Sequence, residues 1–349
     1  MRSASLLLLF ALPLYAQVEP EVDPKHGGDR RLVPARGYEG RDEKAYERLR
    51  ALAASGEDLR DRKLAHYARI FLESYPHSDR TGGVLHLLGT TLYRMKLRDE
   101  AYPVLQRVLR DHPRHAGAAQ AEWMVGEVEL ERGKIDAALV AFEHCLEVWK
   151  QRPDELPARA LLRIGRIQAW GGDPEAALKT LQRAMRGWPK SAAVKEIEKH
   201  ELPLLERQRK PAPAAPPLAS SSPDLVKPRM RLVVFWDTSL DVDSDFFKGL
   251  RTLVKELVNR PDIGVFSVQC NAAKTPNQEQ IDLSMAAMKK AELPGVGIIV
   301  QWDGLQAELP AAWAVTRLPT TYLVDATGRI LAAGAPPVVL RTLIPAERK

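Results

Sequence analysis

The chain of 349 residues contains only two cysteines, Cys145 and Cys270, which stand far apart in the sequence. It has no Cys-x-x-Cys pair. This excludes a local dithiol–disulfide cycle, which needs an attacking thiolate and a resolving thiol side by side. In an oxidising compartment, two such thiols are either bonded to each other or buried and inert. We expect them to be buried and separate, because they fall in different halves of the chain.

Several other chemical signatures are absent. There is no glycine-rich phosphate loop and no serine elbow of the hydrolase type. The histidines of the first half lack the spacing of metal ligands. The acidic cluster of Asp237, Asp241, Asp243 and Asp245 lacks the turn glycine and the distal glutamate of a calcium loop. We therefore expect neither a metal ion nor a cofactor, and treat these aspartates as solvated or as helix caps.

An excess of charge of one sign is also absent, because the formal net charge is only +6. Basic and acidic residues alternate along the helical stretches, which indicates a solvated surface rather than a nucleic-acid footprint. Long apolar runs are confined to the N-terminus, where Arg2 precedes an apolar run from Leu6 to Leu14 and Ala16 offers a cleavage point. This pattern predicts a secretory signal peptide at residues 1–16. The alternative is an uncleaved membrane anchor, although the run is short for a bilayer span.

The rest of the chain divides by composition. Residues 17–42 are rich in proline, glycine and charge, and are expected to form a flexible leader. Residues 43–208 have the apolar spacing of helices, and residues 229–349 alternate strand-like and helix-like blocks. Between them, residues 209–228 form a linker of proline, alanine and serine, which we expect to be semi-rigid and to separate two domains. No segment after the signal peptide predicts a membrane span.

The helical half contains an internal repeat anchored on Gly89, Gly126 and Gly165. From each glycine, an alanine follows at +12, a large apolar residue at +16 and a smaller one at +19. These three positions hold Ala101, Leu105 and Val108 in one repeat, Ala138, Phe142 and Cys145 in the next, and Ala177, Leu181 and Ala184 in the third.

This spacing resembles the tetratricopeptide repeat. The glycine and the alanine would let two helices approach closely, and the larger residue would fill the groove between them. Cys145 occupies the small-residue position, so we expect it in the core. Trp123, Trp149, Trp170 and Trp188 are interpreted as helix-packing residues.

A fourth repeat is expected before these three, ending at Phe71-Leu72-Glu73-Ser74-Tyr75-Pro76. The sequence segments 71–78 and 108–113 resemble segments of tetratricopeptide proteins of the bacterial cell envelope, which serve outer-membrane assembly and division complexes. The resemblance implies a protein partner in the envelope and a periplasmic location. It does not identify the partner, and the sequence does not predict the oligomeric state.

The second half resembles a thioredoxin-like domain of the bacterial, membrane-associated thiol–disulfide oxidoreductase type. The stretch Leu232 to Ser239 is similar to the first core strand and the approach to the active site. The stretch Leu318 to Ile330 is similar to the cis-proline loop and the hairpin that follows it. The expected fold is therefore multidomain, with all-α tetratricopeptide-like repeats followed by an α/β thioredoxin-like domain.

The resemblance places the two catalytic cysteines at Leu240 and Asp243, neither of which can supply a thiol. Asp243 would instead cap the N-terminus of the helix. Pro319 would follow a cis peptide bond, and the backbone near Leu318 and Thr320 could present a peptide-binding edge. We therefore expect an exported, non-catalytic adaptor or scaffold that is redox-inactive. The alternative is a divergent oxidoreductase that uses the single Cys270.

Overall fold

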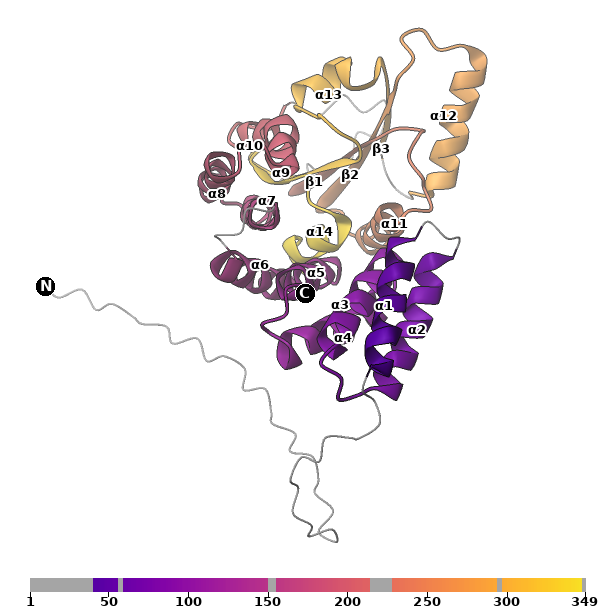
Figure 1. Ribbon diagram of the computed structural model, residues 1–349. Helices are drawn as coiled ribbons and strands as arrows, with labels where there is room; N and C mark the ends of the chain where they lie inside the picture. Colours follow the sequence, from indigo (N-terminus) through magenta and orange to yellow (C-terminus); the bar gives the residue numbers. More distant parts are fainter. Residues whose placement is uncertain (1–39, 56–58, 150–154, 214–227, 294–296, 347–349) are drawn as a thin grey trace, which may run out of the picture.

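The computed structural model describes residues 40–55, 59–149, 155–213, 228–293 and 297–346 (Figure 1). The expected signal peptide, nearly all of the leader and most of the linker lie outside these described residues. No helix within the described ranges is long and apolar enough to cross a membrane.

Eight consecutive helices of the described chain form an array in which each helix packs against its neighbours in sequence (Figure 1). The first pair is the expected fourth repeat, and the other three pairs follow the glycine anchors. The helices are α1 (Arg41–Ala54), α2 (Arg60–Ser74), α3 (Thr81–Arg94), α4 (Arg98–Asp111), α5 (Ala118–Glu131), α6 (Ile135–Trp149), α7 (Leu156–Trp170) and α8 (Pro174–Gly187).

The glycine anchors act as the spacing predicts, because each faces the large apolar residue sixteen positions later. A methyl group at any of these glycines would overlap that side chain, so the helices of a pair could not approach as closely. Cys145 is fully buried in the same core, as expected. A Cβ atom would lie 2.7 Å from Leu105 at Gly89, 2.7 Å from Phe142 at Gly126 and 2.5 Å from Leu181 at Gly165.

The array ends in a continuous helical segment made of α9 (Ala192–Glu196), the π-helical turn η1 (Ile197–Glu201) and α10 (Leu202–Gln208). Ser191 begins it as an N-cap whose Oγ accepts a hydrogen bond from the Val194 N–H at 3.2 Å. The segment buries Val194 and Ile197 in the core of the array, and α10 continues toward the second half of the chain.

The second half is built on a five-stranded sheet with the order β3-β2-β1-β4-β5. The three strands β1, β2 and β3 are parallel, while β4 runs antiparallel to β1 and β5 antiparallel to β4. The strands are β1 (Met230–Trp236), β2 (Ile263–Asn271), β3 (Gly297–Trp302), β4 (Thr320–Asp325) and β5 (Ile330–Ala333).

Helices connect these strands in the order that the resemblance implies. The first parallel crossover passes through α11 (Asp245–Leu257) and the second through α12 (Gln278–Ala291). A short 3₁₀ turn, η2 (Gly304–Gln306), and α13 (Glu308–Ala312) precede β4, and α14 (Pro337–Leu343) follows β5. The central β1 strand, buried over nearly its whole length, and the terminal antiparallel hairpin give the sheet its thioredoxin-like form.

The two halves contact each other directly, on either side of the linker that the sequence predicts. In Figure 1, α11 and α14 lie between the sheet and the helical array. The turn at Gly133 approaches α14 so closely that a Cβ there would lie 3.0 Å from Val338. The Gln208 amide donates to the carbonyl oxygens of both Ala169 in the array, at 2.7 Å, and Leu331 in β5, at 3.0 Å. Composition indicated a linker, but it could not reveal that α10 packs against β5.

Candidate functional site

The positions of the missing cysteines lie in the loop between β1 and α11. Leu240 is half-buried and packs against the hydrophobic core. Asp243 is exposed, and its carboxylate lies 3.1 Å from the Lys290 Nζ of α12. The hydrogen bond from Lys290 lowers the pKa of Asp243, so this carboxylate is ionised at neutral pH. Neither residue offers a nucleophile at neutral pH that could replace a thiolate.

Asp243 is not the N-cap of the helix, contrary to the sequence prediction. The N-cap position belongs to Ser244, and its side chain makes no capping hydrogen bond. Asp243 instead donates its backbone N–H to the Asp241 carboxylate at 2.9 Å, which tightens the turn and delays the start of α11. Asp237 accepts similar local hydrogen bonds from Ser239. The described part of the chain contains no cluster of three metal-ligating side chains.

The peptide bond between Leu318 and Pro319 is cis, as the resemblance implies. Thr320 is buried and starts β4, and its hydroxyl donates to the Arg317 carbonyl oxygen at 2.7 Å. Leu318 and Pro319 are half-buried. The Thr320 side chain is therefore occupied within the loop, and peptide binding at this edge stays a prediction that rests on Leu318, Pro319 and the backbone.

Cys270 lies within β2 and is 1% exposed. Burial, together with the negative charge of Asp237, raises the pKa of this thiol to about 12. Both Cys270 and Cys145 are free and buried, as expected. A catalytic cysteine needs a lowered pKa and an accessible sulfur. Cys270 instead has a raised pKa and a buried sulfur.

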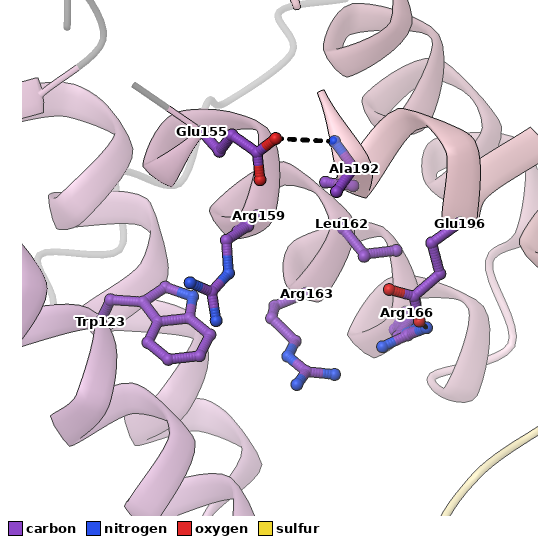
Figure 2. A pocket seen from close by; sticks show the side chains of 9 residues that line it. Trp123, Glu155, Arg159, Leu162, Arg163, Arg166, Ala192 and Glu196 are labelled. Carbon is purple, nitrogen blue, oxygen red and sulfur yellow. Dashed lines mark hydrogen bonds and ion pairs between the residues drawn. The ribbon is translucent and has the colours of Figure 1, made fainter. Parts of the chain in front are cut away.

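The helical array contains a pocket of about 300 Å³ between α5, α7 and α9 (Figure 2). From the sequence, Trp123 is expected to be a packing residue. It is indeed buried, but one side of it also lines this pocket. Three arginines at helical spacing along α7 point toward the same space, a pattern that could have marked this face in the sequence. The lining consists of Trp123, Glu155, Arg159, Leu162, Arg163, Arg166, Ala192, Ala193 and Glu196.

Two of the three arginines are neutralised by internal carboxylates. Arg163 makes a two-pronged ion pair with Glu127, with distances of 2.6 and 2.7 Å. Arg166 is buried, pairs with Glu196, and donates from Nε to Glu201 Oε1 at 3.0 Å. Planar guanidinium groups match carboxylates in this way, and the pairing compensates the desolvation of both charges.

Arg159 differs from its two neighbours on α7. Its guanidinium carbon lies 3.9 Å from the centre of the Trp123 indole ring, which is a cation–π contact. In the described residues it has no carboxylate partner. The buried Nε1–H of Trp123 likewise has no acceptor. Figure 2 shows this nitrogen beside the Arg159 guanidinium.

Glu196, which lines the pocket, also takes part in the contact between the two halves. Arg317, which immediately precedes the cis peptide bond, lies 3.0 Å from both Glu196 and Glu201. Both carboxylates also pair with Arg166, so two arginines and two glutamates form one network. Burial opposes the ionisation of Glu196, but the charges and hydrogen bonds of Arg166 and Arg317 outweigh it and lower its pKa.

A second, more apolar pocket of about 490 Å³ lies between α1 and α2. Tyr67 and Ile70 line it and are 51% and 43% exposed. Its lining contains one charged side chain, Arg48. The pocket is therefore an apolar surface without the convergent polar groups that fix the orientation of a small ligand.

Comparison with known proteins agrees with this division of the chain. The tetratricopeptide repeat family model matches residues 117–190, which span α5 to α8. None of the curated proteins compared with the chain matches it. Residues 117–190 thus match tetratricopeptide repeats, and the helix pairs before them are arranged in the same way. The sheet order and the cis-proline loop give the second half a thioredoxin-like fold.

Solved structures that are similar to parts of the chain include both types of domain. A thiol-disulfide oxidoreductase from Bacteroides fragilis is 23% identical, covers 35% of this chain and 84% of its own, and gives a TM-score of 0.30. MamA from Desulfovibrio magneticus is 17% identical, with coverage of 48% and 85% and a TM-score of 0.39. A tetratricopeptide repeat protein from Parabacteroides merdae is 16% identical, with coverage of 48% and 60% and a TM-score of 0.40.

Proposed function

We propose that the protein is an exported, non-catalytic adaptor of the cell envelope. Its tetratricopeptide repeats would bind partner proteins, and its thioredoxin-like domain would be a redox-inactive module docked on the array. Repeat arrays of this kind present extended surfaces for protein binding. The apolar N-terminal segment of residues 1–16 supports export, and the resemblance to envelope repeat proteins supports a periplasmic location.

The observation that carries the non-catalytic assignment is the state of the thiols. Leu240 and Asp243 stand where the family has its cysteine pair, and the remaining thiol of that domain, Cys270, is buried with a pKa of about 12. At neutral pH the thiolate fraction of such a group is negligible. The alternative, an oxidoreductase that uses Cys270 alone, would require this buried sulfur to become accessible and acidic.

Chemical cross-linking in a bacterium that produces the full-length, C-terminally tagged chain tests the adaptor function. We expect the protein in the periplasmic fraction, with cross-links between residues 59–208 and one or a few discrete proteins. A variant that lacks residues 2–16 is the control, and it should stay in the cytoplasm and lose those cross-links. Wild-type protein that remains cytoplasmic, or that cross-links to nothing above the tag-only background, would overturn the proposal.

A further inference from the structure

The pocket between α1 and α2 is a groove with apolar walls. Leu49 and Phe71 line it and are buried, whereas Tyr67 and Ile70 line it and are 51% and 43% exposed. Exposed apolar side chains that adjoin one another, rather than scattered single ones, mark a surface that binds another molecule. A trough between two packed helices has the shape that accepts the apolar face of a third helix. The groove is therefore a candidate site for a helix.

The α1 side of this groove is basic. Arg48 lines the groove, and Arg41 and Lys44 lie seven and four residues before it, which places all three on the same face of α1. Among the described residues, none of these three cations has a carboxylate partner.

The acidic residues of the helix pair do not balance this charge. Four of the five carboxylates of α1 and α2 already have partners in the described chain. These pairs are Asp42 with Ser78, Glu43 with Arg80, Glu47 with Arg50, and Asp61 with Arg60 and Arg94. The fifth, Glu73, is exposed on α2, one helical turn after Ile70. One carboxylate on α2 does not neutralise three cations on α1, so the rim of the groove is positive.

The exposed face of α6 has the complementary character. Val140 and Val148 on this helix are 64% and 51% exposed. At about 100° per residue, Asp136, Glu143 and Glu147 fall along one edge of the same face, beside Val140. The helix contains no lysine or arginine, and these three carboxylates have no cationic partner in the part of the chain that the structure describes. The face is therefore apolar with one acidic edge.

The two surfaces match each other as a helix and a groove. With the acidic edge of α6 against α1, three carboxylates face three cations, and the exposed valines of α6 face Tyr67 and Ile70. Within one chain, α3, α4 and α5 separate α6 from the α1–α2 pair (Figure 1), so the two surfaces cannot meet. An α6 helix that occupies the groove therefore belongs to a second copy.

We propose that the groove between α1 and α2 binds α6 of a second copy of this chain. The contact is heterologous, because the groove of one copy meets a different surface of the next. Each pair of copies keeps one unoccupied groove and one unoccupied α6 face, so the contact builds an open row of copies. This inference concerns self-assembly and does not rest on the adaptor function.

Sedimentation velocity of the chain without residues 1–16, over a range of concentrations, tests this assembly. We expect the wild type to form dimers and longer oligomers. Ile70→Glu in the groove and Val140→Lys on α6 should each raise the dissociation constant about tenfold or more, because each places a charge opposite others of the same sign. Both side chains are exposed in the single chain, and circular dichroism checks that the variants fold. The matched control is Val258→Lys after α11, also 50% exposed, which should assemble like the wild type.

An equimolar mixture of the two variants tests the pairing of these two surfaces. The Ile70→Glu chain keeps its α6 face and the Val140→Lys chain keeps its groove, so one contact can form. The mixture should therefore give dimers and nothing longer, whereas each variant alone stays monomeric. Four results would overturn the proposal: a wild type that is monomeric at every concentration, a variant that assembles like the wild type, a Val258→Lys control as weakened as the variants, or a mixture without dimers.

Discussion

At the scale of single residues, the chemistry of the thioredoxin-like domain is determined by where its polar groups and its thiol lie. Leu240 packs on the core, Asp243 pairs with Lys290, and Cys270 is enclosed within β2. The absence of a cysteine pair was evident from the sequence. The sequence also predicted a buried Cys270, but the extent of its burial depends on the strands and helices that pack around it.

Cys270 should resist alkylation in the folded protein. In a Cys145→Ser background, iodoacetamide at pH 8 should modify Cys270 only after denaturation, since burial keeps the thiol protonated and covered. The raised pKa also fixes the sign of a pH effect. Stability is unaffected well below the ordinary thiol pKa, and it decreases as the pH rises from about 9 toward 12, because the unfolded thiol ionises first. Mass spectrometry of labelled protein measures the first effect. Rapid modification in the native state would contradict it.

The contact between Trp123 and Arg159 could not be predicted from the sequence, for a different reason. Trp123 and Arg159 belong to successive repeats, and only the packing of α5 against α7 brings them together. Trp123 has the sequence context of a packing residue, and it does pack. Its place on the pocket wall, with an unpaired indole N–H, depends on the tertiary packing and not on the residues beside it in sequence.

At the scale of helices and strands, the sequence predicted the four helix pairs and the five strands, but not α9, α10, α13 or α14. The repeat spacing predicted the helix pairs, and the thioredoxin-like resemblance implied the succession of strands and helices along the chain and the cis peptide bond. The main error was local. Asp243 is a good cap by residue type, but the turn through Asp241 moves the start of α11 to Asp245.

Gly165→Ala tests the glycine anchor of the third repeat. The added Cβ would lie 2.5 Å from Leu181 in the closely packed α7–α8 pair, so we expect a loss of about 1–3 kcal/mol in the free energy of unfolding. The matched control is Gly187→Ala at the end of α8, where nothing lies within 4 Å of the new methyl group. That control should be neutral or slightly stabilising. Urea denaturation compares the two. Equal effects would show that close approach at the anchor is unimportant.

Arg166→Met tests the buried ion-pair network that joins α7 to η1. It leaves the buried Glu201 with the half-exposed Arg317 as its remaining cation, so we expect a loss of about 3–5 kcal/mol. The double variant Arg166→Met with Glu201→Met should recover much of this loss, because it also removes the buried carboxylate that has lost one of its two arginine partners. A double variant no more stable than the single one would show that the ion pair itself, rather than the stranded carboxylate, carries the stability.

At the scale of the whole molecule, the two halves pack directly against each other. Residues 209–228 have the composition of a linker, which is why the sequence suggested separation. Composition describes the connection, however, and not the surfaces on either side of it. Those surfaces include the Arg317 network, the contacts of Gln208 and the close approach of Gly133 to α14.

Acidification should weaken the contact between the halves. The lowered pKa of Glu196 means that its ionised form stabilises the folded state above the ordinary carboxyl pKa of about 4. That contribution is lost as the pH falls through the lowered value. Thermal unfolding followed from pH 7 to pH 3 should show a decline that is smaller in Glu196→Gln. A variant with the same pH profile as wild type would remove Glu196 from the explanation.

The redox inactivity of the thioredoxin-like domain is tested most directly by insulin reduction with purified protein that lacks residues 1–16, beside its Cys270→Ser variant. We predict no turnover above the rate of the dithiol reductant alone in either protein. Leu240 and Asp243 carry no thiol, and the thiol of Cys270 is buried and protonated. Turnover by the wild type that disappears in Cys270→Ser would contradict this prediction. The protein would then be a single-cysteine oxidoreductase rather than an adaptor.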